Sequence, residues 1–235
     1  MDLTALLAYT RILADELDAA PDGVFEDDDL TIVLNVAKDK VYLDLIDLIP
    51  QRFRKTKKIS LVASQREYVI STGLLVTDLM AIEVIVRNIA GKRPWPLIEI
   101  SPEQSHQFME NPTYTDTYPS VWIREEEDKL AFEPIPSGSL ADALKMYYFQ
   151  EIPDLSESTP TVAPALPRLA HPLICLDALR QWGIRTAEGQ AAVDARYAET
   201  LETVAQKLSM KSALRGAQLP GTIEMSGYGE DIVES

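Results

Sequence analysis

Two histidines, one cysteine and a run of four acidic residues are the side chains of this sequence best suited to chemistry. Zinc sites bring histidine and cysteine together at short, regular spacings. His106 and His171 lie far apart, and neither falls in an HExxH or a cysteine–histidine spacing. Cys175, the only cysteine, lies on the apolar side of a helical pattern, where a buried hydrophobe is more common than a nucleophile. The sequence therefore predicts no zinc site and no catalytic thiol.

The acidic run Glu26–Asp29 could bind a divalent metal, because hard cations prefer carboxylate oxygens. Adjacent residues of a helix point in different directions, however, and no ligand-loop spacing follows. Acidic residues in the first turn of a helix interact favourably with the positive end of its dipole. We interpret Asp27–Asp29 as the start of a helix. A divalent-metal-dependent enzyme that uses these acidic residues is kept as an alternative.

Signatures of hydrolases and nucleotide-binding proteins are missing from the sequence. The patterns GxSxG, GxxxxGK(S/T) and GxGxxG do not occur. Carboxylate pairs are expected by chance among 37 acidic residues. We therefore predict a protein that is not an enzyme and has neither catalytic residues nor a cofactor.

Charged and apolar side chains in two segments are the candidates for partner binding. Gln51–Lys58 concentrates cations in an acidic chain, which suits an acidic partner surface or a solvated connection. The segment 211–235 has weak periodicity and an acidic end, which predicts a flexible tail that is either disordered or folds onto a partner. The candidate partner-binding residues are Arg52, Arg54, Lys55, Lys57, Lys58, Tyr228, Ile232 and Val233.

The overall charge restricts the possible partners. With 22 basic and 37 acidic residues the formal net charge is −15, which disfavours binding DNA by general phosphate neutralisation. The charge fits a self-repelling surface, or an acidic wall past which DNA slides. No apolar run approaches the roughly 20 residues of a membrane span, and the start of the chain predicts no signal peptide. A single cysteine fits a reducing cytoplasm.

Helical periodicity predicts two helices near each end of the chain. The second helix carries two apolar stripes, one through Leu30, Leu34 and Val41 and another through Ile32, Val36, Leu43 and Ile46. A helix that is apolar on more than one side must bury more than one side, in a core or against a neighbouring subunit. The predicted helices are Leu3–Ala19, Leu30–Ile49, Pro172 to just before Gly189, and Gln190–Leu208.

The period of the apolar residues changes to two from Ile59 onward, which predicts a small, largely antiparallel sheet between Lys57 and Gln150. Within it, Ile59–Ala63 and Tyr68–Ile70 are expected to form a hairpin. Val121–Arg124 is expected to pair with Leu130–Glu133.

The fold class predicted from these elements is α+β. N-terminal and C-terminal helices form a bundle, a small, largely antiparallel β-sheet domain is inserted between them, and a flexible tail follows. The predicted parts are the helical pair 1–56, the β-rich domain 57–150, the Pro-rich connection and helical pair 151–210, and the tail 211–235.

The order of these elements resembles the head–tail adaptor, or connector, proteins of tailed bacteriophages. Each motif consists mainly of prolines and aromatic residues, and together the motifs extend from Leu3 to Leu208. They are the two helices joined by an acidic turn in Leu3–Ile49, the sheet entry Ile59–Ile70, Tyr118-Pro119 before Trp122, Phe132–Pro136, Leu144–Tyr148 before Ile152–Leu155, and Leu166-Pro167 before a long helix.

The resemblance implies a structural virion protein that is made in the host cytoplasm and located at the head–tail interface. Such adaptors form a ring, commonly of twelve copies, beneath the portal of the filled capsid. The ring extends the DNA channel, which genomic DNA crosses without sequence-specific binding, and offers a platform for downstream tail proteins. The expected partners are thus other copies of the chain, the portal and tail-completion proteins, with no membrane. Another tail-completion or tube assembly protein is the structural alternative.

Overall fold

The computed structural model describes two compact units. A β unit combines Met1–Ala5 with Phe53–Leu166, and a helical unit combines Leu6–Arg52 with Pro167–Ser235. The architecture is α+β, with helices from both ends of the chain packed together and antiparallel sheets in the middle, which confirms the predicted fold class. The described residues are 1–16, 26–89, 91, 93–104, 115–156, 158–159, 164–182 and 186–217, with side chains up to 210.

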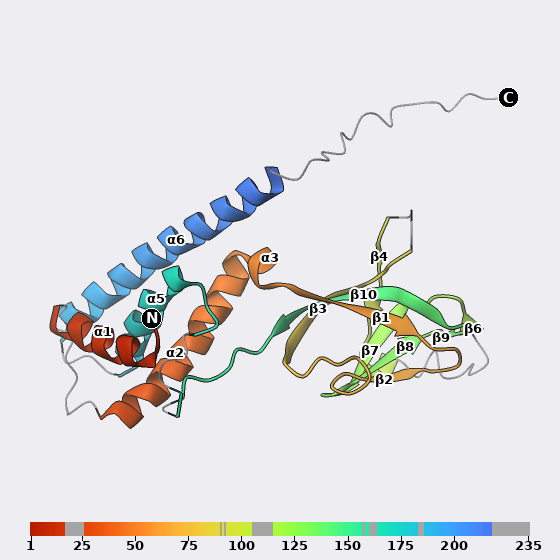
Figure 1. Ribbon diagram of the computed structural model, residues 1–235, viewed down its shortest axis with the longest axis horizontal. Helices are drawn as coiled ribbons and strands as arrows, with labels where there is room; N and C mark the ends of the chain where they lie inside the picture. The colour runs from red at the N-terminus through yellow and green to blue at the C-terminus, as the bar shows by residue number, and fades with distance from the viewer. Residues whose placement is uncertain are drawn as a thin grey trace. The chain divides into compact units, whose positions relative to one another are not determined.

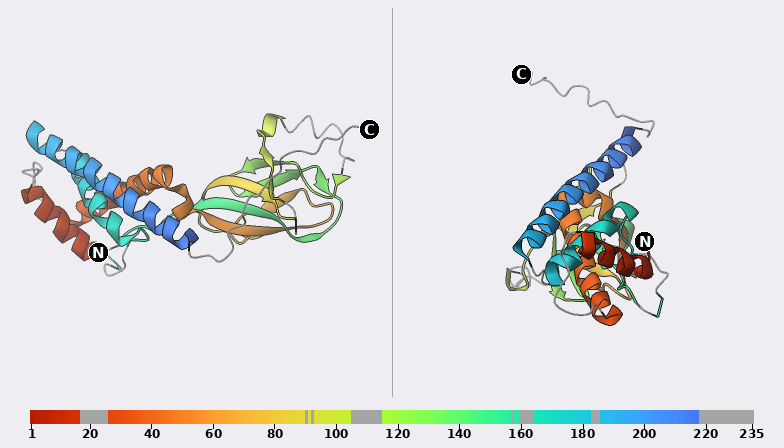
Figure 2. Two further views of the ribbon diagram at one scale, coloured as in Figure 1. Left: turned by 90° about the horizontal axis from the view of Figure 1, so that it is seen from above. Right: turned by 90° about the vertical axis from the view of Figure 1, so that its left-hand side faces the viewer.

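In the helical unit, α2 packs against α5 and α5 packs against α6, as Figures 1 and 2 show. The Cys175 thiol of α5 contacts the Leu6 carbonyl oxygen of α1 at 3.7 Å, so α1 also lies against α5. The helices are α1 (Leu3–Glu16), α2 (Asp27–Leu48), α3 (Pro50–Phe53), the short 3-10 helix η1 (Arg168–Ala170), α5 (His171–Trp182) and α6 (Ala187–Ala217).

The helix starts follow the local sequence. Asp2 caps α1, because its Oδ1 accepts a hydrogen bond of 2.9 Å from the Ala5 amide. Asp27–Asp29 occupy the first turn of α2, which confirms that they start a helix. Arg11 forms an ion pair with Asp27 and thereby joins α1 to α2.

Helix α6 is longer than the sequence predicts. Apolar spacing stops at Leu208, and a flexible tail was expected from Lys211, but the backbone stays helical to Ala217. The prediction is therefore wrong for 211–217, a stretch rich in the strong helix formers Lys, Ala, Leu and Arg. The remainder of the predicted tail, 218–235, lies outside the described residues.

The described residues of the β unit form two four-stranded sheets and one two-stranded sheet, where the sequence predicts one small sheet. Their strand orders are β1-β10-β3-β4, β2-β8-β7-β5 and β6-β9. Neighbouring strands are antiparallel except for the parallel pairs β5–β7 and β6–β9. The strands are β1 (Lys55–Leu61), β2 (Glu67–Val69), β3 (Leu79–Arg87), β4 (Trp95–Pro96), β5 (Ile98–Glu99), β6 (Thr115–Asp116), β7 (Val121–Glu126), β8 (Lys129–Glu133), β9 (Ile135–Pro136) and β10 (Leu140–Gln150).

Strands β1 and β2 do not form the predicted hairpin. They belong to different sheets, since β1 pairs with β10 and β2 pairs with β8. Alternating apolar residues specify which face of a strand is buried but not which strand lies beside it. The predicted pairing of Val121–Arg124 with Leu130–Glu133 is confirmed by the antiparallel pair β7–β8.

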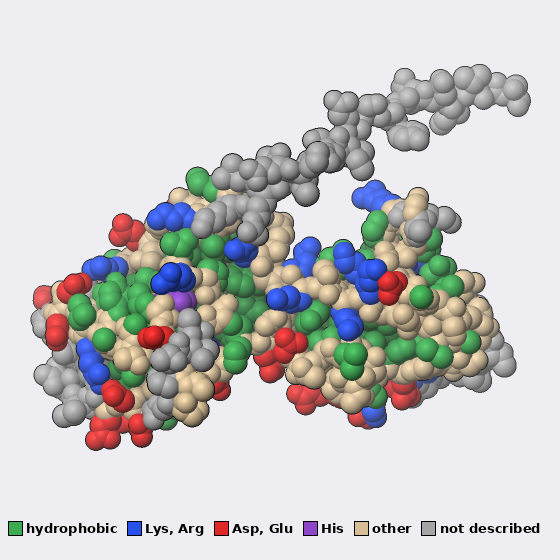
Figure 3. All heavy atoms as spheres, viewed as in Figure 1, with side chains coloured by type: hydrophobic (Ala, Val, Ile, Leu, Met, Phe, Trp, Pro, Cys, Tyr) green, Lys and Arg blue, Asp and Glu red, His purple; other side chains and the backbone are tan. Residues whose placement is uncertain are grey.

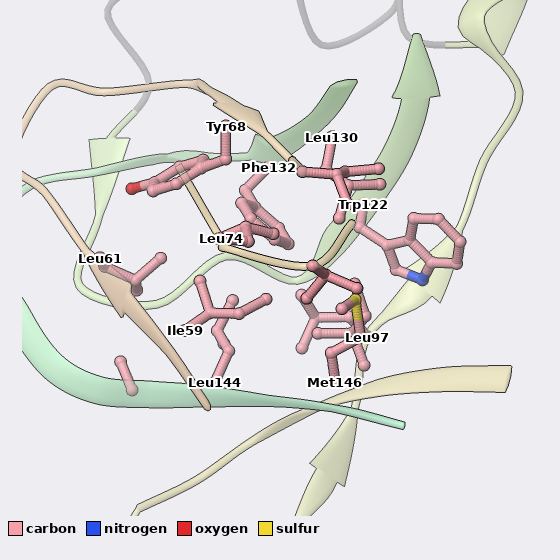
Figure 4. Close-up of a cluster of buried hydrophobic side chains, with 14 residues drawn as sticks. Ile59, Leu61, Tyr68, Leu74, Leu97, Trp122, Leu130, Phe132, Leu144 and Met146 are labelled. Atoms are coloured by element: carbon pink, nitrogen blue, oxygen red, sulfur yellow. The ribbon is translucent and has the colours of Figure 1, made fainter. Parts of the chain in front are cut away.

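The apolar core of the β unit is built from both four-stranded sheets (Figure 4). The rings of Tyr68 and Phe132 meet edge to face, with their centroids 5.3 Å apart. The Tyr68 hydroxyl also accepts a hydrogen bond of 2.9 Å from the Val62 amide, so its polar end is satisfied. Side chains of β1 and β10 meet those of β2, β7 and β8 in this core, among them Ile59, Leu144, Met146, Tyr68, Trp122, Leu130 and Phe132.

Candidate partner-binding surfaces

The basic run predicted from the sequence is divided by the fold. Arg52 lies in the last turn of the short helix α3 and belongs to the helical unit, whereas the other four cations belong to the β unit. Lys55, Lys57 and Lys58 lie on β1, the edge strand of its sheet. Lysines on an edge strand discourage unwanted pairing with another strand, so they suit a binding surface and a protective one equally well.

Two of these cations already have carboxylate partners. Arg54 forms an ion pair with Glu83, and Lys58 Nζ lies 2.7 Å from Asp142 Oδ2. The structure describes no ion pair for Lys55 or Lys57 with another described residue. On β1, the exposed Lys55 and the half-buried Lys57 are therefore the cations whose charge remains available to a partner, and on α3 the exposed Arg52 is available in the same way.

Strand pairing places two further residues, Lys145 and Tyr147, beside the basic run, and neither is among the partner-binding residues predicted from the sequence. Lys145 of β10 lies directly opposite Lys58 of β1, and Thr56 lies opposite Tyr147. The Tyr147 ring is approached by both Lys145 Nζ, 4.7 Å from its centroid, and the Arg54 guanidinium, 5.3 Å away. Figure 3 shows the resulting concentration of Lys and Arg side chains over β1, β10 and β3. We name Arg54, Lys58, Lys145 and Tyr147 the cationic face.

Helix α2 buries only one of its two apolar stripes. Leu30, Leu34 and Val41 are fully buried, as expected for a core helix. In the second stripe Ile46 is buried, but Ile32, Val36 and Leu43 remain 63%, 52% and 50% exposed. We name these three residues the α2 face.

Acidic side chains surround the α2 face. Asp39 lies within the stripe, meets Lys38 Nζ at 3.3 Å and keeps 59% of its side chain exposed. Asp28, Asp29 and Asp47 are exposed along its sides, and Figure 3 shows acidic side chains gathered at the N-terminal end of α2. A partner for this face would need apolar surface accompanied by cations.

A polar network joins α5 to α2 and to α6. The fully buried Asp177 accepts hydrogen bonds from Lys40 Nζ at 3.0 Å and from Arg180 at 3.2 Å, as well as one from the side-chain Nε2 of Gln181. Arg180 Nε also reaches Asp194 Oδ1 at 2.7 Å. Because a buried carboxylate is costly unless it is paired, this network fixes how α2, α5 and α6 pack. We name it the helix clamp, comprising Lys40, Asp44, Asp177, Arg180, Asp194 and Tyr197.

Tyr197 completes the helix clamp. Its hydroxyl donates a hydrogen bond of 2.6 Å to Asp44 Oδ2, and its ring lies 4.5 Å from the Arg180 guanidinium. Burial and the neighbouring Asp44 carboxylate raise the Tyr197 pKa. Hydrogen bonds from Gln190 and Arg180 lower the Asp194 pKa. The clamp therefore keeps the tyrosine neutral and the aspartate charged.

Cys175 and His171 are both buried in the packing of the helical unit. Cys175 is fully buried, and desolvation raises its pKa to about 12, which keeps the thiol protonated. His171 is buried at the start of α5, and His106 lies outside the described residues. Across the described parts of the chain, no three His, Cys, Asp or Glu side chains are grouped as a metal site would require. None of the helices in those parts is both long and apolar enough to cross a membrane.

The chain also matches the model of a known protein family. Residues 1–221 match the family model described as SU10 adaptor protein. The chain belongs to this family of phage head–tail adaptors. Among curated proteins, none matches the chain.

The family confirms the resemblance drawn from the order of prolines, aromatic residues and helices. SU10 adaptors are structural proteins that connect head and tail components, so the role of this adaptor is structural and non-enzymatic. Its functional residues must then be sought on surfaces. The matched range ends before Tyr228, Ile232 and Val233, which also lie outside the described residues.

Proposed function

We propose that this SU10 adaptor assembles into a homo-oligomeric ring of twelve copies beneath the portal. The ring extends the channel through which genomic DNA passes and provides the platform for downstream tail or tail-completion proteins. The adaptor is thus a virion protein of the head–tail interface. The α2 face is the observation that carries the proposal, because a core helix with three large, half-exposed apolar residues suits contact with another chain.

A cyclic ring uses such a face repeatedly. In head-to-tail association each copy contributes one face to the preceding copy and a different one to the following copy, and a suitable rotation closes the ring. Burial of apolar surface contributes roughly 25 cal/mol per Å² at each contact. A modest contact suffices because the closed ring repeats it around the circle.

The net charge of −15 fits a protein that surrounds DNA without holding it. Lining a channel with like charge repels the phosphate backbone and weakens adhesion during passage. The cations of the chain would then serve protein partners. We assign Arg52, Arg54, Lys55, Lys57 and Lys58 to contact with the portal or a neighbouring copy, together with Tyr228, Ile232 and Val233 of the tail.

Particle mass tests the ring directly. Twelve chains of 26.2 kDa give a particle of about 314 kDa. We expect this species by mass photometry of the full chain, alone or after incubation with portal rings. A particle of six copies would favour a tail-completion or tube protein, and a chain that stays monomeric under both conditions would contradict the proposal.

A further inference from the structure

We propose that the α2 face of one copy packs in parallel on α6 of the next copy. This assignment rests on the proposed ring and identifies the two surfaces that would join its subunits. The receiving surface, which we name the α6 face, consists of four exposed residues on one side of that helix. They are Arg196, Thr203, Lys207 and Met210.

The α6 face complements the α2 face in charge. Its residues recur at spacings of seven, four and three, which places them on one side of a helix. Met210 is 63% exposed, and Thr203 and Lys207 are also exposed. Arg196 forms a long ion pair of 3.7 Å with Glu16 and keeps 45% of its side chain exposed. Two cations beside an exposed methionine therefore suit an apolar stripe that is accompanied by acids.

Charge spacing fixes the register of the two helices. Arg196 precedes Lys207 by eleven residues, and Asp28 precedes Asp39 by the same eleven, a rise of roughly 16 Å along either helix. In a parallel arrangement with Lys207 beside Asp39, Arg196 falls beside Asp28. Successive residues of a helix are turned by about 100°, which places Asp28 and Asp39 on the same flank of the α2 face. Arg196 and Lys207 lie on one flank of the α6 face, and in the parallel arrangement these two flanks face each other. Reversing one helix keeps the eleven-residue match along the axis but places the two cations on the flank opposite to the two acids.

The same parallel register also matches the uncharged residues. Thr203 falls one residue, about 1.5 Å of rise, from the level of Val36, and Met210 falls one residue from the level of Leu43. Helix axes pack about 8–10 Å apart when their side chains permit. A threonine within a helix can direct its hydroxyl to a carbonyl oxygen of the preceding turn, which leaves its methyl group for apolar contact. The compact Thr203 side chain therefore allows a close approach, with its methyl group against Val36.

Ring symmetry favours this parallel arrangement. Within the helical unit α2 and α6 run in the same general direction, as Figure 1 and the left-hand view of Figure 2 show. Neighbouring copies in a ring of twelve differ by a rotation of about 30°, which turns any helix by no more than that angle. Helix α6 of the next copy therefore stays roughly parallel to α2 of the first.

Disulfide trapping tests the contact in the full chain. The double variant Val36→Cys/Thr203→Cys should form, on mild oxidation, a ladder of dimers, trimers and larger species, because each copy links to the next. Two facing cysteines can bridge only when their Cα atoms lie within about 7 Å. The native Cys175 is buried and its thiol stays protonated, so it should not interfere.

The single variants reveal the type of contact. Val36→Cys alone and Thr203→Cys alone should form no linked species, and an equal mixture of the two should form dimers only. Dimers of Val36→Cys alone would show that two α2 faces meet symmetrically, which overturns the proposal. The absence of a ladder from a double variant that still forms rings would overturn it as well.

Charge exchange provides an independent test. Asp39→Lys or Lys207→Glu alone should weaken each subunit contact about fivefold, and the combined variant should recover most of that loss. Glu99→Lys, which changes an exposed acid of the β unit, is the matched control. Rings that form normally with both single exchanges would refute the α2–α6 contact and leave the ring itself standing. A wild-type chain that never forms rings would instead refute the proposed function.

The register also predicts one unfavourable pair. Glu199, exposed on the other flank of the α6 face, falls near the exposed Asp29 of the neighbouring α2. Both carboxylates stay in water at the rim of the contact, so their repulsion is weak. Glu199→Gln should therefore strengthen each subunit contact about twofold. Rings that dissociate more readily with this variant than with the wild type would contradict the register.

Discussion

Replacing Asp177 with alanine should lower the free energy of unfolding of the helical unit by about 3 kcal/mol. Removing one partner from a buried ion pair typically costs about 3–5 kcal/mol. The lower value applies because the cations left behind can recover part of their solvation. The Lys40 side chain is 46% exposed, while Arg180 is 29% exposed and retains Asp194 as a partner.

Urea unfolding monitored by the helical circular dichroism signal measures this change. With a slope of about 2 kcal/mol per M, the midpoint of the helical transition should fall by about 1.5 M. Asp177→Asn retains a hydrogen-bond acceptor and should cost roughly half as much. Asp194→Ala is the matched control, since the Asp194 side chain is 46% exposed and its loss should cost less than about 1 kcal/mol.

The comparison between the two aspartates decides the interpretation. If the free energy of unfolding of Asp177→Ala lies within about 0.5 kcal/mol of the wild-type value, the helix clamp does not stabilise the packing of α2, α5 and α6. Equal losses of unfolding free energy for Asp177→Ala and Asp194→Ala would likewise contradict the argument that the buried Asp177 carboxylate contributes more to stability than the half-exposed Asp194.

Three further perturbations test other parts of the molecule. Phe132→Ala should destabilise the β unit by about 3–5 kcal/mol in urea unfolding, because the ring is fully buried against Tyr68; a loss below about 1 kcal/mol would contradict its place in the core. The Cys175 thiol, whose pKa is raised from 9.0 to about 12, should contribute stability below pH 9 that is lost as the pH rises toward 12. Unfolding measured across this range should therefore show a pH-dependent component that Cys175→Ala lacks, and identical profiles would refute it. Binding to portal rings, measured by pull-down, should weaken at least fivefold in the double variant Lys55→Glu/Lys57→Glu and also on deletion of residues 216–235. Lys129→Glu is the surface control. Unchanged binding of either variant would show that the altered segment does not contact the portal.

Local features of the sequence translated well into local structure. The carboxylate of Asp2, placed before an apolar periodic segment, caps α1, and Asp27–Asp29 fill the first turn of α2. The two apolar stripes of α2 correspond to two different surfaces of the helix. Its inner stripe is buried in the helical unit, and most of its outer stripe remains on the surface. Periodicity therefore identified both faces, although it could not say which one the chain itself covers.

Features that depend on distant segments were not predictable in the same way. The pairing of β1 with β10 brings Lys145 and Tyr147 beside the basic run, and nothing in the spacing near β1 indicates that partner. The helix clamp was missed for a similar reason. Asp177 stands in an apolar helical run, and only the packing of α2 and α6 around α5 reveals why a carboxylate is retained there. Helix α6 continues beyond its last regularly spaced apolar residue, Leu208, because the strong helix formers of 211–217 sustain it without an apolar stripe.

The central claim is that this SU10 adaptor forms a ring that docks on the portal. Electron microscopy of the purified full chain mixed with portal rings tests it most directly. The account predicts a second ring, coaxial with the portal and continuous with its channel, whose subunits number twelve. Portal particles that remain bare while the adaptor stays monomeric would contradict it.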